Sequence, residues 1–140
     1  MIDRAAGRLS EIERNLDVMA IHGNGASLRV LERAGVSGAS LVIAVTDLDE
    51  VNMLACMLAK QAGAHTTIAR VRDPDYDTDL ALASDGTYAG VDVTINPDHQ
   101  AAVDIARLIK NPDSSEFDYL AGGKVQILSY IVEPDSPVAH

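Results

Sequence analysis

The chain has 140 residues, of which 47% are hydrophobic and 23% are charged, a composition typical of one globular domain with its own apolar core. Its formal net charge of −10 excludes the basic surface with which proteins bind DNA, RNA or anionic lipid. The single cysteine, Cys56, excludes an internal disulfide and favours a reducing compartment. No apolar run approaches the ~18 residues of a membrane span, so we expect a cytoplasmic protein without direct membrane insertion.

Short apolar runs alternate with amphipathic stretches in the first half of the chain. Residues 7–15 predict a short helix, residues 16–21 a strand, and the stretch between Ser27 and Gly35 a second short helix. Residues 41–45 read Leu-Val-Ile-Ala-Val, a run typical of a strand that is buried on both faces. Asp47 or Asp49 then caps a helix that extends to about residue 62, where Gly63 ends it.

The same alternation continues in the second half. Residues 66–71 and 91–95 predict strands, and the pairs Asp73-Pro74 and Asn96-Pro97 predict the starts of the helices that follow them. Residues 111–115 have the composition of a linker, and residues 124–132 predict one more strand. Alternating strands and helices indicate a parallel sheet, with ligands at the carboxyl ends of its strands. We therefore look for a site in the loops at 22–27, 46–50, 70–75 and 96–98.

The turn Gly23-Asn24-Gly25 lies between a predicted strand and a predicted helix, as the glycine-rich loop of a dinucleotide site does. Asp47 follows at about the distance of a ribose-binding acid. The third glycine of such a loop is replaced by Leu28, however. Two interpretations stay open, a pyrophosphate loop and a tight turn that needs glycine for its own geometry.

No catalytic or metal-binding constellation is recognisable. The alternating aspartates 73, 75, 77 and 79 resemble a calcium loop, but Thr78 and Ser84 occupy the positions of its glycine and bidentate acid. The four histidines are scattered without metal-ligand spacing. We therefore expect no enzyme. Arg70 ends a predicted strand at the ligand-facing edge, where its guanidinium could bind phosphate or pair with a neighbouring aspartate.

Four segments carry a resemblance to a known family. They are Leu16-Asp17-Val18-x-x-x-His22-Gly23-Asn24-Gly25-Ala26-Ser27, then Ala44-Val45-Thr46-Asp47-x-Asp49-Glu50-Val51-Asn52-Met53-Leu54-Ala55, then Ile68-Ala69-Arg70-Val71-Arg72, and Ile95-Asn96-Pro97-Asp98. In this order and spacing they resemble the TrkA regulatory subunits of Trk potassium uptake, whose nucleotide-binding unit is the RCK or KTN domain. The resemblance covers most of residues 1–110.

The resemblance implies a Rossmann-like α/β fold with a doubly wound parallel sheet in the strand order 3-2-1-4-5-6. By this alignment the first strand, its glycine-rich loop and the first helix are absent, and the missing strand is a central one, so that a misplaced start or a fragment is expected. The implied domains are an incomplete nucleotide-binding domain at residues 1–110, a linker at 111–122, and the first strand of a following TrkA-C-like domain at 123–140.

The resemblance also assigns cofactor-binding residues. Asp3 ends the second family strand, where its carboxylate would bind the adenosine ribose, and the loop containing Asn24, Gly25 and Ala26 would border the adenine. The other implied cofactor residues follow the fourth and fifth family strands: Thr46, Asp47, Glu50, Asn52 and Arg70. Asp98 matches an acidic position near the nucleotide phosphates or a divalent metal ion.

The implied function is regulatory and not catalytic. The family binds NAD(H) or ATP/ADP, and we expect this binding to be weakened here by the loss of the glycine-rich loop. The implied partners are a membrane potassium-transporter subunit and further copies of the chain, in a dimer or tetramer peripheral to the inner face of the membrane. Two alternatives stay open: a fragment of an NAD-dependent oxidoreductase, and a pseudo-domain that keeps only an oligomer interface.

Overall fold

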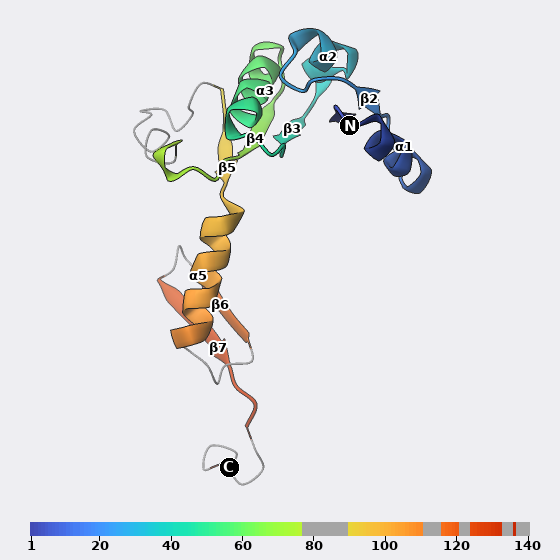
Figure 1. Cartoon of the computed structure of the whole chain (residues 1–140). Coiled ribbons are helices and arrows are strands. Elements are labelled where there is room, and N and C mark those ends of the chain that lie inside the picture. Colours follow the sequence, from blue (N-terminus) through green and yellow to red (C-terminus); the bar gives the residue numbers. More distant parts are fainter. Residues whose placement is uncertain (77–89, 111–115, 121–123, 133–135, 137–140) are drawn as a thin grey trace. The chain divides into compact units, whose positions relative to one another are not determined.

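The chain divides into two compact units, Met1–Pro97 and Asp98–His140 (Figure 1). This computed structural model describes residues 1–76, 90–110, 116–120, 124–132 and 136. Among these residues no helix has both the length and the apolar character that crossing a membrane requires. The first unit holds the parallel strands that sequence analysis predicts.

The first unit begins with a small parallel sheet of two strands. β1 (Ile2–Asp3) pairs with β2 (Ile21–His22), and α1 (Ala6–Asn15) connects them. β2 is shorter than the strand predicted over residues 16–21, because Ile21 is the one residue of that predicted strand that pairs with β1. The chain then forms α2 (Leu28–Arg33) and a 3-10 turn η1 (Val36–Gly38), with Gly35 between them at a φ of 79° that favours glycine.

A second parallel sheet has the order β3-β4-β5, with β3 (Leu41–Ala44), β4 (Thr66–Arg70) and β5 (Val93–Ile95). α3 (Asp49–Gln61) connects β3 to β4 and lies against both strands (Figure 1). Small side chains make this contact close, since Ala55, Cys56 and Ala59 of the helix are buried. The parallel register brings the carboxyl ends of β3 and β4 to the same edge of the sheet.

β3 differs from the prediction that it is buried on both faces. Ala44 is buried against α3, but Leu41 and Ile43 on the other face are 48% and 54% exposed. The sequence pattern predicts a strand that is covered on both faces, whereas β3 is the end strand of its sheet in the described part of the chain. The prediction of two-sided burial is therefore wrong for these residues.

In the region of residues 73–89, only the start of the predicted helix lies within the described residues. Residues 74–76 are helical, and the carboxylate of Asp73 accepts a hydrogen bond from the Asp75 N–H at 3.0 Å, as a helix cap does. Asp77, Asp79 and the rest of that helix lie outside the described residues.

The second unit contains most of α5 (Pro97–Lys110) and an antiparallel pair, β6 (Glu116–Leu120) with β7 (Val125–Ser129). β6 occupies part of the 111–122 segment assigned to a linker, and the division between the units falls after Pro97, before the predicted boundary at residue 110. The predicted strand at 124–132 is present as the shorter β7. The domain boundaries stay predictions.

Candidate functional site

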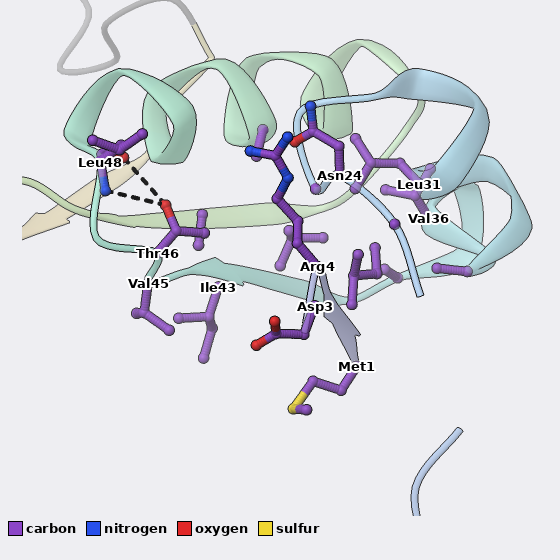
Figure 2. Close-up of a pocket in the computed structure, with 18 of the residues that line it drawn as sticks. Met1, Asp3, Arg4, Asn24, Leu31, Val36, Ile43, Val45, Thr46 and Leu48 are labelled. Carbon is purple, nitrogen blue, oxygen red and sulfur yellow. Dashed lines mark hydrogen bonds between the residues drawn. The ribbon is translucent and has the colours of Figure 1, made fainter. Parts of the chain in front are cut away.

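A groove of about 680 Å³ lies in the first unit at β1 and β3 (Figure 2). Its volume is within the range of about 300 to 1,000 Å³ that is usual for small-molecule sites. Residues from β1, the turn after β2, and β3 with its following loop form its walls. Five of the predicted cofactor residues line it together: Asp3, Asn24, Gly25, Thr46 and Asp47.

Asp3 supplies a carboxylate at the carboxyl end of β1. Its Oδ1 accepts the Ala5 N–H at 2.7 Å, and its Oδ2 lies 3.4 Å from Nη1 of Arg8. The backbone hydrogen bond from Ala5, together with the Arg8 charge, lowers the pKa of Asp3 although burial acts in the opposite direction. The side chain is therefore an ionised acceptor at neutral pH, suited to the hydroxyl groups of a sugar.

The turn after β2 lines the groove and contains two glycines. They differ in the space that a side chain would find at each position. A Cβ on Gly23 would lie 2.9 Å from Cγ1 of Val30, so packing against Val30 excludes any side chain at this position. A Cβ on Gly25 would meet nothing within 4 Å, so packing within the chain does not require this glycine. Asn24 fixes the turn because its Oδ1 accepts the Ala26 N–H at 3.1 Å.

Asn52 joins the ends of β3 and β4. Its side chain is fully buried, and its Oδ1 accepts both the backbone N–H and the hydroxyl of Thr46 at 2.7 Å. Its Nδ2 donates to the Thr46 carbonyl at 3.0 Å and to the Arg70 carbonyl at 2.8 Å. All these partners belong to the protein, so the amide is placed to position Thr46.

Arg70 and Asp47 contact each other beside this junction. Nη2 of Arg70 donates to the Thr46 carbonyl at 2.7 Å and lies 3.1 Å from Oδ1 of Asp47, whose side chain is 94% exposed. The sequence left two roles open for Arg70, phosphate binding and pairing with a neighbouring aspartate. The structure contains the ion pair with Asp47. The buried Nε of Arg70 has no hydrogen-bond partner within the described residues.

Asp49 closes the same edge from the first turn of α3. Its Oδ2 accepts the backbone N–H groups of Arg72 and Asp73 at 2.8 and 3.0 Å. Burial would raise the pKa of Asp49, but these hydrogen bonds and the Arg72 charge outweigh it and the pKa is lowered. This carboxylate links the loop after β4 to α3 by hydrogen bonds, and it thereby stabilises the conformation of that loop.

Other predicted residues do not line the groove: Ala26, Glu50, Asn52 and Arg70. Glu50 instead accepts the Tyr76 hydroxyl at 3.3 Å, and its charge raises the pKa of Tyr76. Asp98 begins the second unit, and no group of three or more potential metal ligands occurs in the described part of the chain. A metal at Asp98 stays a prediction.

Arg4 and Arg8 line the groove beside Asp3, and sequence reasoning missed both. Their signal was present in the sequence Asp3-Arg4-x-x-x-Arg8, which places two cations directly after a strand. In Figure 2 the Asp3 side chain lies on the side of Ile43, whereas the Arg4 side chain extends toward Asn24. The groove therefore combines an apolar wall with an anionic acceptor and two cations.

A parallel α/β fold with a groove of ligand size that runs along β1 and β3 to their carboxyl ends is typical of the Rossmann-like class. The family model of the TrkA-N domain matches residues 1–97, and the chain belongs to this family.

Relatives of this chain are potassium-uptake proteins by name. The chain is 39% identical over 128 residues to the Trk system potassium uptake protein TrkA homolog of Archaeoglobus fulgidus, covering 91% of this chain and 29% of the relative. It is 38% identical over 128 residues to TrkA homolog 2 of Methanosarcina mazei, with coverages of 86% and 28%. The Trk system potassium uptake protein TrkA of Halomonas elongata is 37% identical over 130 residues, with coverages of 92% and 28%. The chain thus spans less than a third of these relatives.

Solved structures share the fold at low sequence identity. The GsuK RCK domain has a TM-score of 0.62 and 21% identity, covering 81% of this chain and 23% of that one. The GsuK channel bound to NAD has a TM-score of 0.59 and 17% identity, with coverages of 86% and 20%. The NAD(P)-binding domain of an exopolyphosphatase-related protein from Archaeoglobus fulgidus has a TM-score of 0.60 and 16% identity, with coverages of 78% and 77%. These likenesses confirm the Rossmann-like fold.

Proposed function

We propose that the chain is a nucleotide-binding regulatory module of a potassium-uptake system. The observation that carries this proposal is the groove itself, which gathers Asp3, Gly25 and Thr46 at the carboxyl ends of parallel strands in a TrkA-N domain. Structures of GsuK bound to NAD and to ADP share this fold, which supports a nucleotide as the ligand class.

Each part of the groove has a role toward such a ligand. The ionised Asp3 carboxylate would accept hydrogen bonds from ribose hydroxyls, and the open side of Gly25 would let the ligand approach the backbone. Arg4 and Arg8 would bind phosphate oxygens through their guanidinium groups. Asn52 and Arg70 would act indirectly, because their contacts hold Thr46 and Asp47 in place.

The ligands we propose are NAD(H) and ATP or ADP, bound with reduced affinity. The 140 residues contain no Gly-x-Gly-x-x-Gly sequence, and this loop with its helix N-terminus normally binds the pyrophosphate. Contacts to the adenosine part would therefore supply most of the binding free energy.

The proposed setting is a cytoplasmic subunit that forms a homo-oligomer and binds a membrane potassium-transporter subunit at the inner face of the membrane. Names of relatives in Trk systems support it. Ligand control would follow from different affinities of two conformations for different nucleotides. No catalytic role is proposed, and hydride transfer by the purified protein would contradict this part.

Calorimetric titration with ATP, ADP, NAD⁺ and NADH tests the proposal. We expect measurable binding of at least one of them, weakened about tenfold or more by Asp3→Ala because a charged acceptor contributes about 1.5–3 kcal/mol. Gly25→Ala should weaken binding and leave folding intact, since its new methyl enters only open space. Gly7→Ala is the matched control, because Gly7 also has open space around it but does not line the groove. Absence of binding by all four nucleotides would contradict the proposal.

A further inference from the structure

Two arginines lie beside the carboxylate that would bind the adenosine ribose. Arg4 directly follows β1, and Arg8 lies in the first turn of α1. Both line the groove together with Asp3. Nη1 of Arg8 lies 3.4 Å from Oδ2 of Asp3, and in Figure 2 the Arg4 side chain extends toward Asn24. The two cations are therefore next to the ribose carboxylate and the predicted adenine loop.

These cations are only weakly paired within the protein. At 3.4 Å the contact between Arg8 and Asp3 is longer than a charge-assisted hydrogen bond of about 2.7–2.9 Å, and the Arg8 side chain is 67% exposed. The Arg4 guanidinium makes no ion pair or hydrogen bond within the described residues. Asp47, which also lines the groove, pairs with Arg70 instead. Most N–H donors of Arg4 and Arg8 are thus available to a ligand, and one positive charge remains beyond that offset by Asp3.

A phosphate on the ribose of an adenine nucleotide would contact these donors. The Asp3 carboxylate would accept a hydrogen bond from the 2′- or 3′-hydroxyl of that ribose. A phosphate esterified to either oxygen begins one bond away, which is within reach of a guanidinium that lies 3.4 Å from the carboxylate. Such a monoester carries a charge of about −1.5 to −2 at pH 7 and three acceptor oxygens. Guanidinium groups bind it bidentately.

We propose that the groove prefers adenine nucleotides whose ribose carries a 2′- or 3′-phosphate, and that Arg4 and Arg8 set this preference. The preference rests on the proposed function, because it concerns the same site. The two arginines bind the ribose phosphate and not the phosphates of the 5′ chain. Asp3 accepts the ribose hydroxyl that stays free. The dinucleotide of this class is NADP(H), whereas NAD(H) lacks the ribose phosphate.

Calorimetric titration of the 140-residue chain with three small nucleotides tests the preference. Adenosine 2′,5′-bisphosphate and adenosine 3′,5′-bisphosphate carry a ribose phosphate, and AMP is the matched probe without it. We expect at least one bisphosphate to bind about tenfold or more tightly than AMP, because its contacts to two cations outweigh the repulsion from one carboxylate. The isomer that binds more tightly identifies the position of the phosphate.

Two results of these titrations would overturn the preference. Equal binding of all three nucleotides would overturn it and leave nucleotide binding itself intact. Absence of binding by all three would also overturn it, and the titrations with ATP, ADP, NAD⁺ and NADH then decide the proposed function separately.

Substitutions of the two arginines test which phosphate they bind. Arg4→Gln and Arg8→Gln should each weaken binding of the preferred bisphosphate about fivefold or more, and change AMP binding less than about twofold. Arg14→Gln is the matched control, because Arg14 is also exposed on α1 but does not line the groove. Circular dichroism verifies that the variants fold. Equal weakening of AMP and bisphosphate binding would assign the arginines to the 5′-phosphate and overturn the proposal, as would an equal effect of Arg14→Gln.

Discussion

Asn52 shows how a single buried side chain shapes the candidate site without lining it. Its carboxamide exchanges four hydrogen bonds with Thr46 and Arg70, at the ends of two neighbouring strands. The side chain itself is fully buried, so all of its hydrogen-bonding capacity is directed at these partners within the protein. The geometry of the loop after β3 therefore depends on this residue.

Asn52→Ala should lower the free energy of unfolding by about 1–3 kcal/mol, because it removes the partner of the part-buried Thr46 N–H and of the part-buried Arg70 carbonyl. Urea titration followed by circular dichroism measures this change. Asn24→Ala is the control, since Asn24 is exposed and the loss of its turn hydrogen bond should cost less than about 1 kcal/mol. A loss below 1 kcal/mol for Asn52→Ala would show that the junction is not structural.

Asp92 gives the stability of the fold a defined pH dependence. Its Oδ2 accepts the Lys60 ammonium and the Thr67 N–H, both at 2.7 Å. The hydrogen bond from Lys60 lowers the pKa of Asp92, against the opposing effect of burial. The ionised form is therefore favoured by folding, and its stabilisation is complete above the unfolded-state pKa near 3.8 and lost as pH falls through the lower folded-state pKa.

Asp92→Asn should destabilise the chain by about 1–3 kcal/mol at pH 7, and this difference should shrink as the pH is lowered from 5 to 3. Urea titrations of both proteins at several pH values measure it. The exposed Asp17→Asn serves as the control. A difference that grows toward pH 3 would contradict the assigned sign.

At the scale of elements, α2 packs against the turn that borders the groove. Val30 of α2 is buried, and its methyl groups occupy the space where a Cβ on Gly23 would lie. The turn and the helix therefore fit only while position 23 carries no side chain.

Gly23→Ala should lower the free energy of unfolding by about 1–3 kcal/mol, since a stiff β-branched neighbour in a packed site cannot move aside cheaply. Gly25→Ala in the same turn should stay within about 0.5 kcal/mol of the native chain. Thermal unfolding of the two variants side by side measures the contrast, and equal losses would refute it.

The elements that sequence alone predicts best are those with strong local signals. α3 begins and ends close to its predicted bounds and α5 begins at its predicted start, because Gly63 and Pro97 mark these points. The prediction that Asp47 or Asp49 caps α3 is wrong, since Leu48 is at the N-cap position and no side chain caps the helix. The exposure of Ile43 could not be predicted, because an apolar run does not say which neighbours a strand has. β6 was missed since the composition of residues 111–115 suggested that the linker continued through it.

The candidate site, like the fold, could be predicted from the sequence only in part. Asp3, Gly25 and Thr46 lie far apart in sequence but line one groove, as the rule for the carboxyl ends of parallel strands requires. The role of Asn52 could not be predicted, since a sequence does not show whether an amide faces a ligand or its own backbone. Arg4 and Arg8 were missed because the predicted elements placed no loop of interest after residue 3.

At the scale of the whole molecule, two independent divisions of the chain coincide. The first compact unit ends at Pro97, and the match to the TrkA-N domain also ends at residue 97. The buried hydrophobic residues of the core all lie before this point in the described part of the chain. The first unit thus holds its own core.

A chain shortened to residues 1–97 should therefore keep a cooperative unfolding transition. Its urea midpoint should stay close to that of the first transition of the 140-residue chain. Circular dichroism and proton NMR dispersion measure this. Loss of cooperative unfolding would show that the second unit contributes to the stability of the first.

The labelling rate of Cys56 reports how often the core of the first unit opens. The only thiol of the chain is fully buried between α3 and β4, its Sγ donates to the Ile68 carbonyl at 3.3 Å, and burial raises its pKa to about 11. A thiol reagent can reach it only when the helix separates from the sheet, so the labelling rate counts those openings. We expect labelling at least about 1,000-fold slower than in urea-unfolded chain, and slower still with a bound nucleotide. Mass spectrometry over time measures the rate at which Cys56 is modified. Rapid labelling of the native chain would show that the core opens often.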